Sequence, residues 1–275
     1  MRRGIRKTRL KKFGLALGGG GAKGLCHLAF IKALDEMGLR PAIIAGTSIG
    51  AIMGGFYASG MSGAEMEALL KANLHDINRM MDISLFRRSG IKRGKAAEEL
   101  FYRHIPASRF EDLEIPLKVV ATDFWDRREV IFDSGVLIPA IRASIAMAGV
   151  FEPVTLNGTV LVDGGGVNPL PYDIIQNDCD ITVAIDVSGE KTPPAKDAVP
   201  SVIENLLTTY TIMQSSIVKT KLNFAPPDIY IKPALTNIRA TEFHRYDEIM
   251  EGVRDDVAVL KDELERSLKK RRWFF

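Results

Sequence analysis

The residues best suited to chemistry begin with Ser48, the centre of a G-x-S-x-G pentapeptide that runs from Gly46 to Gly50. The short apolar segment Ala42–Ala45 precedes this pentapeptide, and a helix-forming run follows it. In a strand–turn–helix of this kind the serine stands on a tight turn with its hydroxyl exposed, and flanking glycines avoid clashes across the turn. The start of the next helix favours developing negative charge. Ser48 is therefore a candidate nucleophile; the alternative is a turn whose serine only caps the helix.

A glycine-rich loop, Gly18-Gly19-Gly20-Gly21-Ala22-Lys23-Gly24, follows the apolar segment Phe13–Leu17. Consecutive glycines cost conformational entropy, so a folded protein keeps them for a reason. Consecutive backbone N–H groups at a helix start can hold an anion. The spacing matches a dinucleotide fingerprint, but the next predicted strand lacks the acidic end which that site needs. A P-loop is excluded because Gly24, not Ser or Thr, follows Lys23. The loop thus predicts an oxyanion hole formed by the amides of Gly18, Gly19, Gly20 and Gly21.

An aspartate at the end of a third apolar segment, Val160–Asp163, is followed by Gly164, Gly165 and Gly166. At a strand end, Asp163 would be open to the edge of the sheet where ligands collect in α/β proteins. The alternative is an ordinary turn aspartate.

A serine nucleophile needs a base, and histidine is the usual one. The chain has four histidines. His27 follows the glycine loop and is expected to pack there, whereas His75 and His104 lie in polar helical stretches. His244 is the rival, since serine, aspartate and His244 would follow the chain order of α/β-hydrolases. No strand-end turn precedes His244, however, so a histidine base is the weaker alternative.

The elements that must position these residues alternate between strands and helices. Helical periodicity is expected at Leu25–Met37 and Ile49–Ser59, after Ser62, after Ser201, and from Ile249 to Leu268. The helix after Ser201 is expected to have a broad apolar face, formed by Ile203, Leu206, Leu207, Tyr210, Met213 and Ile217. Strands are predicted by short, apolar, β-branched segments. They are Phe13–Gly18, Ala42–Gly46, Leu117–Thr122, Val130–Phe132, Val160–Asp163, Ile181–Val187 and Ile229–Ile231. This alternation predicts an α/β fold with a mostly parallel central sheet covered on both faces.

The charges are distributed unevenly along the 275 residues. Residues 1–12 hold seven Lys or Arg and no acid, and residues 269–272 hold four more. Removing these eleven basic residues from the net charge of +3 leaves −8 for the rest. An acidic body argues against a nucleic-acid-binding surface. We expect a basic N-terminal tail (1–12), a single catalytic domain (13–268) and a basic–aromatic C-terminal tail (269–275). The two tails could hold the protein at anionic membrane surfaces, and the alternative is that both are merely solvated.

The remaining composition favours a cytoplasmic protein. No apolar run approaches the roughly 18 residues of a membrane helix, and the apolar segment after residue 12 is too short for a convincing secretory signal. Cys26 and Cys179 form no motif, which is typical of a reducing compartment. No sequence pattern indicates a metal or a cofactor. The segment Met80–Gly94 mixes apolar and basic residues and could be either a lipid-facing flap or an ordinary loop.

Taken in order, the glycine loop, the G-x-S-x-G pentapeptide and Asp163-Gly164-Gly165 resemble the patatin-like phospholipases, in particular the bacterial members. Three further strings are similar to that family: Ala121-Thr-Asp123, Arg142-Ala-Ser-Ile-Ala146 and Val167-Asn-Pro-Leu-Pro171. The resemblance runs from about Phe13 to about Val187, and more weakly to Gly252. It implies a three-layer α/β/α fold and a Ser48–Asp163 dyad without histidine. It also implies hydrolysis of acyl esters, typically of phospholipids, without a metal.

Two other functions stay open at this point. The same site could transfer the acyl group to an alcohol or a thiol instead of water. A binding module could use the glycine loop to hold an anionic lipid or nucleotide without turnover.

Overall fold

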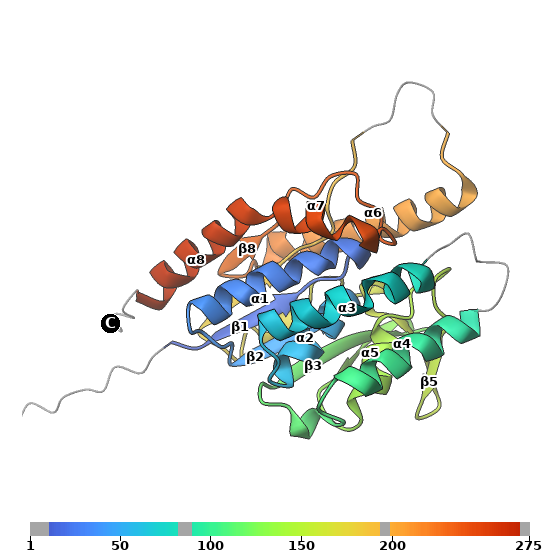
Figure 1. The fold of residues 1–275 in the computed structure, drawn as a ribbon, viewed down its shortest axis with the longest axis horizontal. Coiled ribbons are helices and arrows are strands. Elements are labelled where there is room, and N and C mark those ends of the chain that lie inside the picture. Colours follow the sequence, from blue (N-terminus) through green and yellow to red (C-terminus); the bar gives the residue numbers. More distant parts are fainter. Residues whose placement is uncertain (1–10, 82–89, 193–198, 270–275) are drawn as a thin grey trace, which may run out of the picture.

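The centre of the computed structural model, which describes residues 11–81, 90–192 and 199–269, is an eight-stranded sheet (Figure 1). Five strands form its parallel part, in the order β3-β2-β1-β7-β8. Their bounds are Leu117–Asp123 (β3), Ile43–Thr47 (β2), Phe13–Leu17 (β1), Ile181–Ile185 (β7) and Ile229–Ile231 (β8). The antiparallel strands are β4 (Arg128–Phe132), β5 (Val154–Leu156) and β6 (Thr159–Asp163). The mostly parallel sheet is confirmed.

Helices cover both faces of this sheet, because side chains of a strand point alternately to its two sides. Leu15 and Leu17 of β1 belong to the larger core, which includes residues of every helix on that side. These helices are α1 (His27–Glu36), α2 (Ile49–Ala58), α3 (Gly63–Met81), α4 (Gly90–His104), α5 (Leu137–Ser144), α7 (Tyr246–Glu251) and α8 (Arg254–Lys269). Ala16 of β1 faces the other side, where Val218 of α6 (Val202–Phe224) packs. The three-layer α/β/α fold is confirmed.

Strand β6 approaches β2 end to end, and this arrangement was not expected. Strand β3 pairs with β2 through Leu117–Val120 and with β6 through Ala121–Asp123. Its other edge is occupied by β4 from Val119 to Asp123, so β2 and β6 must share one edge of β3. Strand β6 runs antiparallel to β3, and it is also the second arm of a hairpin with β5.

The turn of that hairpin is Asn157-Gly158, and both residues have positive φ (50° and 81°). Asn-Gly is a strong signal for a two-residue hairpin turn. The predicted strands include the one after this turn, β6, and not the one before it, β5.

The helix starts agree with the capping residues seen in the sequence. The Ser62 hydroxyl accepts from the Glu65 N–H at 3.3 Å, and the Ser201 hydroxyl accepts from the Glu204 N–H at 3.2 Å. The expected apolar face of α6 is only partly buried, because Leu206 and Met213 are 55% and 57% exposed. The second half of α6 covers the sheet, and its first half extends past it (Figure 1).

Several predictions concern residues outside the described ranges. They include most of both tails (1–10 and 270–275) and residues 82–89 of the expected flap, whose flanks belong to α3 and α4. The division into two tails and one domain therefore stays a prediction. Within the described ranges no helix combines the length and the apolarity needed to cross a membrane.

Candidate active site

Ser48 occupies a sharp turn between β2 and α2. Its φ of 55° and ψ of −124° lie outside the regions that residues with a side chain commonly adopt. The turn is tight: a Cβ added at Gly50 would lie 2.0 Å from the Leu17 carbonyl oxygen, and one at Gly46 would lie 2.5 Å from that of Gly50. Glycine is therefore required at both positions, as the pentapeptide predicted.

A hydrogen bond to Ser144, the last residue of α5, holds the backbone of this turn. The Ser48 N–H donates to the hydroxyl of Ser144 at 2.9 Å, and the Ser144 side chain is fully buried. The neighbouring Thr47 hydroxyl donates to the Asn168 carbonyl oxygen at 2.8 Å. These two bonds hold the backbone of the turn, and neither of them uses the Ser48 hydroxyl.

Asp163, the last residue of β6, lies beside Ser48, the residue that follows β2. Thr47 pairs with Val120 of β3, and Asp163 pairs with the next β3 residue, Ala121. Because β2 and β6 share an edge of β3, the residue after Thr47 meets the residue that ends β6. The sheet register thus brings together the two residues that the sequence singled out.

The Asp163 carboxyl is 3% exposed. Its Oδ1 accepts from the Gly165 N–H at 2.7 Å and from the Tyr210 hydroxyl at 3.2 Å. Its Oδ2 has no hydrogen-bond partner among the described residues. Burial raises the pKa of Asp163 to about 6, although the Ser48 hydroxyl, the Gly165 amide and Tyr210 each act to lower it. Asp163 is therefore a stronger base than an exposed aspartate and is still mostly ionised at pH 7.

Tyr210 is a site residue that the sequence analysis missed, because it was read as part of the apolar face of α6. Its hydroxyl donates to Asp163, and burial together with that carboxylate raises the Tyr210 pKa far above its usual value. Gln214, one turn later, lies against Gly165, where an added Cβ would be 2.0 Å from its amide nitrogen. The available signal was this pair of polar side chains one turn apart on an apolar face.

The four amides of the glycine loop have different partners. The Gly18 N–H donates to the Ile185 carbonyl oxygen (3.1 Å) and the Gly19 N–H to that of Pro169 (2.9 Å). No described residue accepts from the amides of Gly20 and Gly21. The sequence predicted an oxyanion hole formed by the amides of Gly18 to Gly21. Because the first two amides already have acceptors, only those of Gly20 and Gly21 remain as candidate donors to an oxyanion.

The other glycines of the motifs allow close packing around the turn at Ser48 and behind Asp163. A Cβ at Gly24 would lie 2.1 Å from Ile49 Cγ2, and one at Gly164 would lie 2.2 Å from the Val120 carbonyl oxygen. Lys23 is buried and donates to the Ile238 carbonyl oxygen at 3.4 Å. Its burial lowers the Lys23 pKa to about 8.

Neither His27 nor His244 is placed in a way that favours it as the base for Ser48. His27 is fully buried, and burial lowers its pKa to about 4. The ring is therefore neutral, and Nε2 donates to the Gly18 carbonyl oxygen at 2.8 Å, which supports the glycine loop. His244, the α/β-hydrolase alternative, has an exposed side chain on the short helix Phe243–Arg245. It is Phe243 that lines the site.

An apolar cavity of about 130 Å³ begins at Ser48 and Gly21. Residues of α2, α3 and α4 form much of its lining, and Asn73 of α3 is its polar residue besides Ser48. Typical lining residues are Ile52, Met53, Phe56, Leu69, Phe101 and Met147. A cavity of similar size and lining in another protein stays dry and binds benzene. This one suits a hydrocarbon chain attached to a group beside Ser48.

Comparisons with known proteins show the family of this chain. The sequence model of the family described as "Patatin-like phospholipase" matches residues 15–175. An uncharacterized NTE family protein of Mycobacterium tuberculosis is 37% identical over 199 residues, which cover 72% of this chain and 55% of that protein. Lysophospholipase NTE1 of Kluyveromyces lactis is 29% identical over 263 residues, covering 86% and 18%.

The chain thus spans just over half of one relative and less than a fifth of the other. Among solved structures, VipD from Legionella pneumophila superposes with a TM-score of 0.55 at 15% identity, covering 93% of this chain and 67% of VipD. This last likeness concerns the fold.

Proposed function

The chain belongs to the patatin-like phospholipase family, and we propose that it hydrolyses carboxylic esters of lipids through Ser48 and Asp163. One observation carries the proposal. A buried carboxylate with a raised pKa and one unpartnered oxygen lies level with the strained serine at the entrance of an apolar cavity. The name of the yeast relative, a lysophospholipase, is consistent with a lipid substrate.

In the first half of the reaction, Asp163 accepts the proton of the Ser48 hydroxyl while Oγ attacks the acyl carbon. The amides of Gly20 and Gly21 donate to the negative oxygen of the tetrahedral intermediate. When the intermediate collapses, the bond to the alcohol oxygen breaks and the proton on Asp163 passes to that oxygen. The acyl group stays on Ser48 as an ester.

In the second half, water replaces the alcohol. Asp163 accepts a proton from the water as it attacks the acyl carbon, and the same amides hold the oxyanion. Collapse breaks the bond to Oγ, the proton returns to Ser48, and the fatty acid leaves. The raised pKa of Asp163 makes it a competent base in both halves.

The pH dependence of the rate should follow the ionisation of Asp163, because only the carboxylate accepts a proton. We expect kcat/KM on a soluble ester to rise with pH and to reach half its maximum near pH 6. In Tyr210→Phe the carboxylate loses a donor that stabilises its charge, so this midpoint should move to higher pH. Stopped assays from pH 4.5 to 9 measure it.

Tyr230→Phe is the matched control. It removes the same kind of bond, a tyrosine hydroxyl donating to the buried Asp186 at 2.6 Å, and so should leave the midpoint unchanged. A Tyr210→Phe profile that coincides with that of the wild type would remove Tyr210 from the proposed site.

The apolar cavity should determine which acyl chains are accepted. Leu69→Trp adds bulk to the cavity wall formed by α3, so we expect at least a tenfold loss of kcat/KM on a decanoyl ester and little change on an acetyl ester. Leu74→Trp, at a partly buried α3 position away from the cavity, controls for overpacking of the core. An equal loss on both esters would place the acyl chain elsewhere.

The rival functions can be separated directly. A fluorophosphonate probe should label Ser48, whereas a passive lipid-binding module should not react. Incubation with a mixed lipid extract should release free fatty acid. If the acyl group instead appeared on an added alcohol or thiol, the protein would be a transferase that uses the same dyad.

A further inference from the structure

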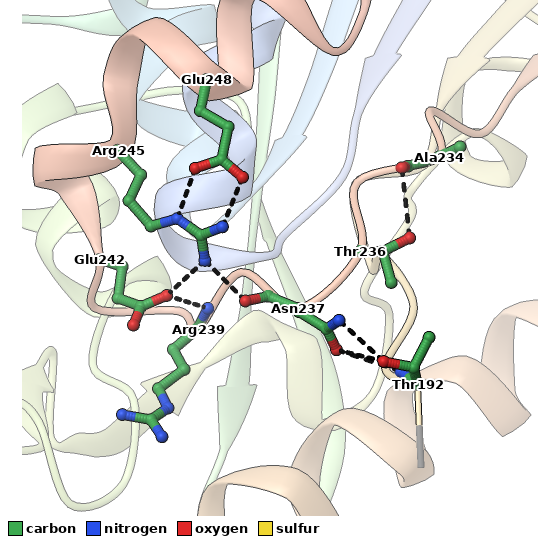
Figure 2. A network of polar contacts seen from close by, with 8 residues as sticks. All are labelled: Thr192, Ala234, Thr236, Asn237, Arg239, Glu242, Arg245 and Glu248. Atoms are coloured by element: carbon green, nitrogen blue, oxygen red, sulfur yellow. Dashed lines mark hydrogen bonds and ion pairs between the residues drawn. The ribbon is translucent and has the colours of Figure 1, made fainter. Parts of the chain in front are cut away.

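A polar network holds the loop Thr236–Glu242 in one conformation (Figure 2). Arg245 donates to Glu242, to Glu248 and to the Asn237 carbonyl oxygen, at 2.6 Å in the last case. Asn237 has a φ of 59°, and its side-chain oxygen accepts from the amide and the hydroxyl of Thr192. The loop is thus tied both to the following helix and to the segment after β7.

The same loop is built against the proposed oxyanion hole. The Ala22 N–H donates to the Ala240 carbonyl oxygen at 2.8 Å, and a Cβ added at Gly21 would lie 2.6 Å from the Ala240 Cβ. Ala240 also lines the cavity that contains Ser48. The residue before it, Arg239, therefore directly precedes a residue of the cavity wall in a loop whose backbone is held in place.

The Arg239 side chain takes no part in the network that holds its backbone. Its N–H donates to Glu242 at 2.9 Å, but its guanidinium points away from Glu242, Arg245 and Glu248 (Figure 2). The side chain is exposed, and within the described ranges it forms no ion pair and no side-chain hydrogen bond. The two acids that attract it are already paired, Glu204 with Lys191 and Glu242 with Arg245.

No charged residue lines the cavity within the described residues, so it has no partner for a charged head group. Its lining is apolar apart from Ser48 and Asn73, so it accommodates the acyl chain only. The two neighbouring cations are already engaged: Lys23 is buried and donates to the Ile238 carbonyl oxygen, and Arg245 is paired with Glu242 and Glu248. A phosphate would find no charged partner in this lining, so a charged head group should stay outside the cavity.

We propose that Arg239 binds the phosphate of a glycerophospholipid substrate while the acyl chain occupies the cavity. This inference rests on the proposed lipid ester hydrolysis. A guanidinium donates two parallel hydrogen bonds to phosphate oxygens, and a loop fixed in advance loses little entropy on binding. Arg239 is then a specificity residue: it selects phosphate-bearing lipids and takes no part in the chemistry at Ser48.

Equilibrium binding of inert ether lipids tests the proposal without requiring turnover. The probes are decyl lysophosphatidylcholine ether and decylglycerol ether, both below the concentration at which they aggregate. In Arg239→Gln we expect the Kd of the phosphate-bearing ether to rise about 10- to 100-fold, the effect of losing hydrogen bonds to a charged group, and that of decylglycerol ether to stay unchanged. Arg239→Lys should fall between, since lysine binds phosphate as a point charge.

Arg266→Gln controls for the loss of one positive charge, because Arg266 is exposed on α8. It should leave both Kd values unchanged. Equal weakening of both ethers in Arg239→Gln, or no weakening of either, would overturn the proposal. Failure of the hydrolase assignment would be recognised separately, as wild-type protein that binds the ethers but cleaves neither decanoyl lysophosphatidylcholine nor decanoylglycerol.

Discussion

Ser48→Ala and Asp163→Asn are each expected to lower kcat on a soluble ester by about 10⁴-fold or more, since a nucleophile and its base act as a unit. For the same reason the double variant should be little worse than either single one. The measurement is turnover of a short-chain ester under saturating conditions. A His244→Ala variant should keep full activity, because its side chain is exposed and is not among the hydrogen-bond partners of Asp163 within the described residues.

The same substitution at Asp163 should make the fold more stable. Its pKa is raised from 3.8 to about 6 in the folded chain, so the contribution of this carboxyl to stability is present below pH 4 and is lost as pH rises through 6. Asp163→Asn removes that penalty, which is about 3 kcal/mol at pH 8 for a shift of this size. Thermal unfolding at pH 8 should show a higher Tm for the variant.

A wild-type activity level in Asp163→Asn would refute the dyad, whatever the stability. A dead but destabilised Asp163→Asn would leave the chemistry in place while contradicting the raised pKa. An inactive His244→Ala would favour the α/β-hydrolase alternative.

Gly20→Ala is the second substitution with a large expected effect. The φ of Gly20 is 173°, which any residue adopts, but an added Cβ would lie 2.3 Å from the Val187 carbonyl oxygen. The loop must therefore shift and carry the free Gly20 amide away from the oxyanion. Losing one such donor costs roughly 2.7–4 kcal/mol, or 10²–10³-fold in kcat. KM should change little, because this charge exists mainly in the transition state.

Gly38→Ala is the control for backbone strain, since Gly38 has a φ of 64° and nothing within 4 Å of an added Cβ. It should lower Tm without changing kcat. If Gly20→Ala raised KM and left kcat intact, the loop would bind an anion of the ground state instead.

The sequence predicted Ser48 and Asp163 by different kinds of signal. The turn at Ser48 has a local signature in the pentapeptide: a Cβ at Gly46 would clash with Gly50 across the turn, while a Cβ at Gly50 would clash with Leu17 of β1. Asp163 was identified by its motif, but its position depends on which edge of β3 the antiparallel strand β6 occupies. Pairing between distant strands has no local pattern that specifies it.

Two features of the site were beyond local patterns for a similar reason. That Gly18 and Gly19 already donate to Ile185 and Pro169 depends on strands and turns far along the chain. Tyr210 contributes through its hydroxyl, whereas its place on α6 indicated only an apolar surface. The Asn157-Gly158 turn, by contrast, was visible in the sequence and predicts the hairpin.

The end-to-end approach of β2 and β6 has a consequence for how this chain tolerates changes in length. Ser48 and Asp163 meet because Val120 and Ala121 are adjacent in β3. One residue inserted between those two would separate the partners by about 3.3 Å and turn one strand over relative to the other. Residues added at the Asn157-Gly158 turn would leave that spacing intact. Insertions and deletions should therefore be tolerated at the hairpin turn and not in β3, which sets the spacing between Ser48 and Asp163.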